Sequence, residues 1–140
     1  MDPPYLQDLM NGLGITELGI FQPSARYHHG MDMVEYHAEN STTVTDWVDP
    51  RLSLISHGHE DRVVGVKFDG FKYEFQRLRN KIGWREGQLL PLTDYLDVIR
   101  QEEVSEEIAS IPGRDQKYDL ARKCIRQVHL TAEDMQEILG

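Results

Sequence analysis

Apolar and polar residues alternate through the middle of the chain. Val34 and Tyr36 alternate with polar neighbours, β-branched residues dominate residues 42–48, and residues 52–55 form a third apolar run. A period of two places successive side chains on opposite faces of a strand. The pattern therefore predicts a small antiparallel β-sheet of about four to five strands over residues 33–76.

The sequence around Asp69-Gly70 fits two structures. Apolar residues alternate on both sides of this pair, and Asp-Gly favours the type I′ turn of a two-residue hairpin. This predicts a hairpin over residues 63–76, followed by a short helix after about Phe75. A second pattern favours a longer helix, because several apolar residues also share one helical face. They are Phe68, Phe71, Phe75, Leu78 and Ile82. The choice between hairpin and helix over residues 68–82 stays open.

Towards the C-terminus the apolar spacing becomes that of helices. Leu96 and Ile99 predict a helix that begins near Thr93, and Thr131 precedes a final short helix. A further apolar stripe at helical spacing consists of Tyr118, Ala121, Ile125 and Val128. Strands followed by helices are typical of the α+β class. We therefore predict a single α+β domain over residues 1–140 with C-terminal helices packed on the sheet, and a short helix over residues 4–13.

The composition is that of a globular protein from a reducing compartment. Hydrophobic residues make up 39% of the chain and charged residues 28%, which is close to ordinary globular usage. The single cysteine, Cys124, has no partner in the chain for a disulfide. No apolar run approaches the length of about 18 residues that a membrane span needs. These features predict a cytoplasmic location without membrane contact.

The net charge of −9 narrows the choice of partner. An acidic field repels nucleic acids and favours basic proteins. Residues 67–85 are the exception, because they combine six basic residues with aromatic ones, a pattern that can bind single-stranded nucleic acid. The alternation of these aromatic residues with charged ones indicates that they belong to the core. We therefore expect a basic protein partner and not a nucleic acid.

Four glutamates form the most acidic short stretch of the predicted helical region. They are Glu102, Glu103, Glu106 and Glu107. Spacings of three and four residues place side chains on the same face of a helix. The glutamates are therefore predicted to form an acidic ridge that either is solvated or binds a basic partner. We take them as the candidate partner-binding residues.

A second candidate site lies in the loop after residue 55. His57, His59 and Asp61 stand in the sequence His57-Gly58-His59-Glu60-Asp61, which resembles the His-x-His-x-Asp-His signature of the metallo-β-lactamase superfamily. The resemblance implies a metal site on these three residues that activates water for hydrolysis, because imidazole and carboxylate are suitable ligands for zinc.

The same loop departs from that signature in two ways. Arg62 occupies the position of the last histidine, so that a fixed positive charge would lie beside the metal ion. The residues that follow, Val63–Val66, have the pattern of a strand, whereas the loop of the family leads into a helix. A metal-dependent hydrolase or metal-binding regulator is therefore the alternative to the binding-protein hypothesis.

A wider resemblance covers residues 33–68. It rests on Tyr36, on Val48-Asp49-Pro50 and on Arg62-Val63-Val64-Gly65. Small bacterial proteins of uncharacterised function are similar at these positions. The resemblance implies an antiparallel sheet and no particular activity.

The sequence contains no complete catalytic motif and no cofactor-binding motif. The leading hypothesis is a non-enzymatic acidic protein that binds a more basic macromolecule and inhibits or regulates it, as immunity proteins and antitoxins do. We expect no cofactor. Homo-oligomer formation stays open.

Overall fold

The computed structural model describes residues 15–16, 20–21 and 23–140. Its main sheet has five antiparallel strands in the order β3-β4-β7-β6-β5. The strands are β3 (Ser24–His28), β4 (Met33–His37), β5 (Thr43–Asp49), β6 (Leu52–His57) and β7 (Val63–Asp69). The predicted α+β fold with an antiparallel sheet is therefore confirmed. The alternation pattern missed β3 and placed the end of the sheet beyond Asp69.

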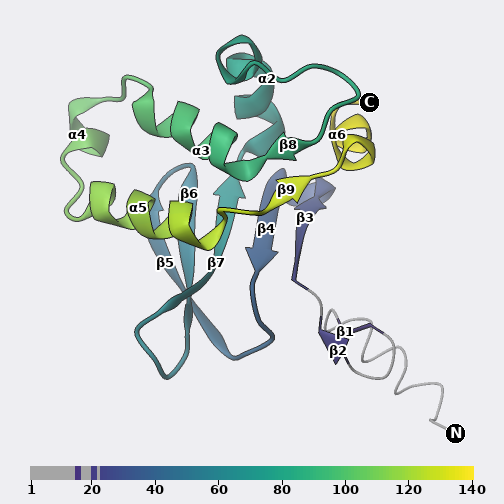
Figure 1. Cartoon of the computed structure of the whole chain (residues 1–140). Coiled ribbons are helices and arrows are strands. Elements are labelled where there is room, and N and C mark those ends of the chain that lie inside the picture. Colours follow the sequence, from purple (N-terminus) through teal and green to yellow (C-terminus); the bar gives the residue numbers. More distant parts are fainter. Residues whose placement is uncertain (1–14, 17–19, 22) are drawn as a thin grey trace, which may run out of the picture.

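The helices are packed on one face of this sheet (Figure 1). They are α2 (Phe71–Ile82), α3 (Leu92–Gln101), α4 (Glu106–Ala109), α5 (Arg114–Cys124) and α6 (Ala132–Leu139), and the short 3-10 helix η1 (His29–Met31) joins β3 to β4. Two short pairs complete the structure: β1 (Ile15–Thr16) with β2 (Ile20–Phe21), and β8 (Leu90–Pro91) with β9 (His129–Leu130). The helix predicted over residues 4–13 lies outside the described residues. No helix in the described part of the chain is both long and apolar enough to cross a lipid bilayer.

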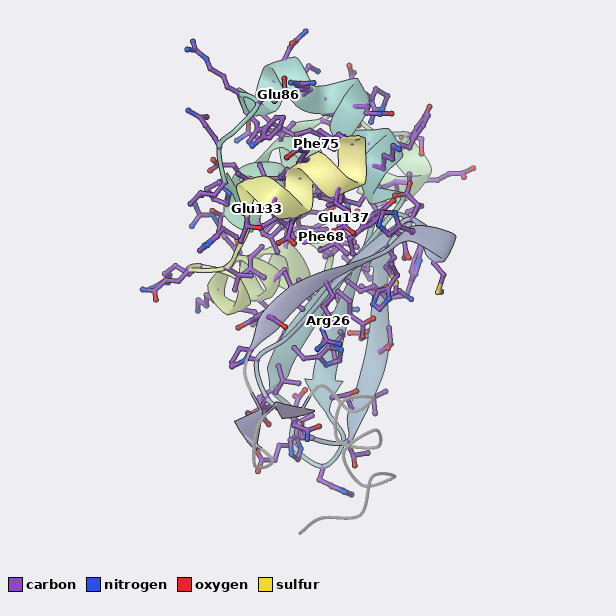
Figure 2. The ribbon with its side chains drawn as sticks, turned by 90° about the vertical axis from the view of Figure 1, so that its right-hand side faces the viewer. Arg26, Phe68, Phe75, Glu86, Glu133 and Glu137 are labelled. Carbon is purple, nitrogen blue, oxygen red and sulfur yellow. The ribbon has the colours of Figure 1, made fainter. Side chains whose placement is uncertain are left out.

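The core lies between the sheet and α2, α3 and α5. Figure 2 shows Phe68 of the sheet and Phe75 of α2 inside this layer. The ring of Tyr95 on α3 packs against Phe68 at 5.1 Å and against Phe71 at 4.7 Å between ring centroids. The stripe predicted for α5 is also buried at Tyr118 and Ala121. The aromatic residues of the basic segment are therefore core residues, with the exception of Tyr73, which is 66% exposed.

Residues 71–82 form a helix, so the hairpin predicted over residues 63–76 is wrong. Gly70 has a positive φ of 63°, and it turns the chain from β7 directly into α2. A strand would have placed Tyr73 on the same face as Phe71 and Phe75. In the helix, Phe71 and Phe75 are fully buried while Tyr73 faces solvent.

A distant residue, Asp32, stabilises the start of this helix. Its main-chain carbonyl accepts from the N–H of Phe71 at 3.2 Å, and its carboxylate accepts from the N–H of Lys72 at 2.7 Å. The hydroxyl of Tyr27 donates to the same carboxylate at 2.8 Å. The first turn of a helix has N–H groups without helical partners, and Asp32 supplies acceptors for them. The tight turn after η1 thus favours the helix over the hairpin.

The fully buried carboxylate of Asp49 joins the sheet to α5. Its Oδ1 accepts from the N–H groups of Arg51 at 2.8 Å and Leu52 at 3.1 Å, which closes the turn between β5 and β6. Its Oδ2 accepts from the hydroxyl of Tyr118 at 2.7 Å and from Nε of Arg114 at 3.0 Å. A buried charge is stable only when it is paired and hydrogen-bonded, and this carboxylate has four donors.

The two partners of Asp49 on α5 also contact one another. The guanidinium of Arg114 lies 4.8 Å from the ring centre of Tyr118, as a cation–π pair. Burial, together with the negative charge of Asp49, raises the pKa of the Tyr118 hydroxyl. The hydroxyl therefore stays protonated and donates to Asp49 throughout the physiological pH range.

We expect the substitution Asp49→Asn to lower the free energy of unfolding by about 3–5 kcal/mol, because it leaves the buried guanidinium of Arg114 without a counter-ion. Urea unfolding followed by circular dichroism measures this loss. Asp46→Asn is the matched control, since Asp46 lies on the same strand and pairs with Lys117 at 3.2 Å while its side chain is 49% exposed. It should cost less than about 1 kcal/mol. Equal losses in the two variants would show that Asp49 is not the junction described here.

Candidate functional site

The four glutamates of the predicted ridge do not share one helical face. The helix α3 ends at Gln101, and Glu102 has extended backbone angles (φ −65°, ψ 138°). The chain then forms the separate short helix α4, which begins after Ser105. The prediction that the four glutamates form one ridge is therefore wrong. Glu102 belongs to the extended segment after α3, and its contacts differ from those of the other three glutamates.

Glu102 is an internal anchor. Its Oε1 accepts from Nη1 of Arg51 at 2.8 Å and from Nη2 of Arg77 at 2.7 Å, and its Oε2 accepts from Nη1 of Arg77 at 2.6 Å. Only 14% of its side chain is exposed. The hydrogen bonds from Arg77 lower the pKa of the Glu102 carboxyl, and the charges of both guanidinium groups act in the same direction. Glu102 is therefore ionised, and its carboxylate is bound by the two arginines.

The two arginines connect Glu102 to the rest of the fold. Arg51 follows Asp49 in the turn between β5 and β6, and its Nη2 also donates to the carbonyl of Ile99 at 2.9 Å. Arg77 lies on α2 and forms a further ion pair with Glu74. We call Arg51, Arg77 and Glu102 the arginine clamp. It fixes the chain where it leaves α3, just before the remaining glutamates.

Glu103, Glu106 and Glu107 are exposed. None of them forms an ion pair within the described part of the chain. We call these three residues the α4 corner. The side chain of Ser105 accepts from the N–H of Ile108 at 3.4 Å and caps α4, and Ile108 and Ile111 are half-buried beside it. The corner thus presents three unpaired carboxylates on a segment held at both ends.

The histidine loop has the geometry of a closed turn. The ring Nδ1 of His57 accepts from the N–H groups of His59 and Glu60, each at 3.1 Å. The rings of His57 and His59 are 6.0 Å apart, and Asp61 is exposed. Within residues 23–140 and the two described pairs before them, no group of three His, Cys, Asp or Glu side chains is arranged to hold a metal ion.

Arg62 adds a positive charge to that loop. Its guanidinium donates to both carboxylate oxygens of Glu39, at 2.7 and 2.8 Å, and its Nε donates to Glu60 at 2.5 Å. These hydrogen bonds lower the pKa of both glutamates. Arg62 therefore connects the loop after β6 to the segment that follows β4. It occupies the position at which the metal-binding signature has a histidine.

The face of the sheet opposite the helices carries a cluster that the sequence did not predict. The carboxylate of Glu35 on β4 contacts Nε2 of His37 on the same strand and Nε2 of His28 on β3, the latter at 3.4 Å. These residues are brought together by strand pairing, since Arg26 and Glu35 are opposite one another and His28 lies two residues further. Both imidazoles contact one carboxylate, which makes this a polar cluster on the outer face of the sheet.

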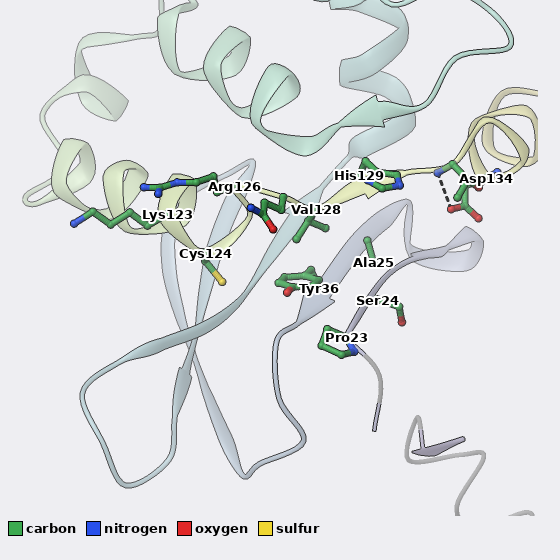
Figure 3. Close-up of a pocket in the computed structure, with 12 residues that line it drawn as sticks. Pro23, Ser24, Ala25, Tyr36, Lys123, Cys124, Arg126, Val128, His129 and Asp134 are labelled. Atoms are coloured by element: carbon green, nitrogen blue, oxygen red, sulfur yellow. Dashed lines mark hydrogen bonds between the residues drawn. The ribbon is translucent and has the colours of Figure 1, made fainter. Parts of the chain in front are cut away.

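A crevice of about 730 Å³ lies between β3 and the segment from α5 to α6. Figure 3 shows Tyr36, Cys124 and Val128 facing its centre, while the charged ends of Lys123 and Arg126 point away along α5. Burial raises the pKa of the Cys124 thiol to about 11. The thiol is therefore protonated near neutral pH and is a poor nucleophile.

Comparisons with protein-family models, with curated proteins and with solved structures found no match to this chain. The candidate site consequently rests on geometry. Within the described residues the α4 corner gathers three exposed carboxylates without ion pairs beside the arginine clamp, whereas α6 carries two, Glu133 and Glu137. The sequence spacing identified the glutamates of the corner, but it did not predict that Glu102 pairs with Arg51 and Arg77.

The clamp predicts a pH-dependent stability. Because the folded state lowers the pKa of Glu102, the clamp contributes stability at a pH above the unfolded value of 4.5 and loses it as the pH falls through the lower folded pKa. At neutral pH we expect Glu102→Gln to lower the free energy of unfolding by about 2 kcal/mol. The difference from wild type should shrink as the pH falls below the unfolded value.

The neighbouring substitution Glu103→Gln is the matched control, because Glu103 is exposed and makes no ion pair within the described residues. It should leave both the stability and its pH dependence close to those of wild type. Urea unfolding at a series of pH values compares the two variants. A Glu102→Gln curve that runs parallel to wild type at every pH would contradict the role of the clamp.

Proposed function

We propose that this chain is a non-enzymatic binding protein that engages a more basic macromolecular partner through the α4 corner and regulates it. The observation that supports this proposal most directly is the contrast between paired and unpaired carboxylates. Glu39, Asp97 and Glu102 are examples of acidic residues that form ion pairs with arginines. The glutamates of the α4 corner remain exposed without such partners in the described structure.

Unpaired carboxylates at short spacing favour a cationic partner. Like charges held close together repel, and a lysine- or arginine-rich surface relieves this repulsion when it binds. At longer range the same charges accelerate association with a basic protein, since electrostatic steering raises the rate constant at low salt. The net charge of −9 adds to this attraction.

The corner is also fixed before binding. The arginine clamp holds Glu102, the side chain of Ser105 caps α4, and the N–H of Arg114 donates to the carbonyl of Ile111 at 3.3 Å. A surface that is already ordered loses less conformational entropy on binding. The half-buried Ile108 adds apolar area beside the charges. These properties suit protein recognition.

His57 and Cys124 belong to residue types that often act in catalysis. His57 is occupied by main-chain donors, and Cys124 is protonated. We propose a cytoplasmic location because Cys124 is the single cysteine of the chain. The role is that of an inhibitor, immunity protein or antitoxin, in which a small acidic protein covers a basic surface.

We expect the tagged protein to capture from its host lysate one basic protein in near-equal amount. The double substitution Glu103→Lys with Glu107→Lys should lower the association rate constant for that partner by about tenfold or more at low salt. Surface plasmon resonance at several salt concentrations measures the effect. The difference from wild type should decrease as salt screens the charges.

Glu133→Lys with Glu137→Lys is the matched control. These two glutamates have the same spacing and give the same change in net charge, but they lie on α6, at the opposite end of the helical layer from α4 (Figures 1 and 2). The control should reduce the rate constant far less. Equal effects of the two double substitutions would show that only the net charge matters for association. An unchanged rate constant for Glu103→Lys with Glu107→Lys would exclude the α4 corner from the interface.

A further inference from the structure

Strand β5 forms an edge of the main sheet. Its outer side pairs with no described strand, and four consecutive residues, 44–47, are exposed. Val44 is 57% exposed and Trp47 is 55% exposed. The strand is rich in residues that favour β-structure, since Thr43, Val44 and Thr45 precede Trp47 and Val48.

Between Thr43 and Trp47 this edge has little protection against pairing with another strand, because its β-bulge lies beyond Trp47. Natural edge strands carry lysine, proline or other charged residues that prevent such pairing. The other edge, β3, follows Pro23 and contains Arg26. Strand β5 has neither lysine, arginine nor proline, and Asp46, its one exposed charge, forms an ion pair with Lys117 of α5.

The strand register shows which main-chain groups point outwards. The N–H of Gly58 donates to the carbonyl of Thr42 at 2.6 Å, so residues 42 and 58 form a hydrogen-bonded pair. Such pairs alternate along an antiparallel ladder with pairs that are not hydrogen-bonded. From the register, Val44 and Asp46 point their main-chain groups to β6, whereas Thr43, Thr45 and Trp47 point theirs outwards.

We propose that β5 pairs with β5 of a second copy of this chain, antiparallel across a two-fold axis, with Thr45 opposite Thr45 of the second copy. Thr43 of each copy then lies opposite Trp47 of the other copy. The three outward-facing residues exchange about six main-chain hydrogen bonds in this register. The two five-stranded sheets become one continuous sheet.

Charge and packing select this register. Shifting the axis to Asp46 would place two aspartates directly opposite one another, which is destabilising. In the proposed register Asp46 lies opposite Val44, on the face of the sheet that carries the helices. Trp47 lies beside Thr43 on the other face, and such aromatic and β-branched pairs stabilise sheets. The register thus buries the two most exposed apolar residues of the edge.

A second copy is the occupant that this edge fits, because the outward-facing main-chain groups of Thr43, Thr45 and Trp47 pair with those of the same strand in antiparallel orientation, and this register keeps Asp46 away from Asp46 of the second copy. The proposal depends on the sheet edge alone and not on the α4 corner or on a basic partner. It therefore stands or fails separately from the proposed function.

Size-exclusion chromatography with multi-angle light scattering, over a range of protein concentrations, tests the proposal. Wild type should have twice the mass of the chain. Thr45→Pro should be a monomer with an unchanged circular dichroism spectrum, because the N–H that it removes points away from β6. Thr45→Val keeps this N–H and should remain a dimer. A monomeric wild type at every concentration would overturn the proposal.

The register itself is tested by charge. Thr45→Lys and Thr45→Glu each place two like charges at the two-fold axis, so each variant alone should lose the dimer. An equimolar mixture should regain a dimer that contains one copy of each, because opposite charges then face one another. This pair also covers the case in which Thr45→Pro fails to fold. Dimers that persist in both single variants, or a mixture that stays monomeric, would overturn the proposed register.

Discussion

The buried carboxylate of Asp49 is the junction on which the arrangement of sheet and helices depends. It closes the turn between β5 and β6 through two main-chain N–H groups, and it binds α5 through Arg114 and Tyr118. A charge this deeply buried is tolerated only with a full set of donors. The position of α5 on the sheet is therefore coupled to the conformation of one two-residue turn.

The same turn positions the candidate site. Arg51 is two residues beyond Asp49 and reaches the C-terminal end of α3, where it binds the carbonyl of Ile99 and the carboxylate of Glu102. Arg77 of α2 completes the clamp. The α4 corner is thus held by residues far away in sequence. Both arginines of the clamp pair with Glu102, and the three glutamates of the corner are exposed without ion pairs in the described structure.

Much of the fold could be predicted because it depends on local pattern. The period-two alternation around Val34 and Tyr36 indicated β4, and the apolar stripe through Tyr118 and Ala121 indicated α5. Thr131 was also identified correctly, since it caps α6 by accepting from the N–H of Asp134 at 3.0 Å. In each case the deciding interactions lie within one turn of helix or one strand.

The errors arose where distant contacts decide between local alternatives. Phe71 and Phe75 suit a strand or a helix equally, and the carboxylate of Asp32, about forty residues earlier, favours the helix. In the same way, spacing placed Glu102 with its three neighbours, although its pairing with Arg51 and Arg77 depends on the tertiary fold. Main-chain donors likewise occupy Nδ1 of His57, one of the three residues that resemble a metal-binding motif.

Amide hydrogen exchange of the variant Arg51→Met tests most directly how the α4 corner is held, because the substitution removes the connection between the turn and the end of α3 but leaves an unbranched side chain at that position. We expect faster exchange for the amides of residues 102–110 and unchanged protection in β6, β7 and α5, because Asp49 still holds α5 in place. Unchanged exchange over residues 102–110 would contradict the claim that the turn between β5 and β6 fixes the α4 corner.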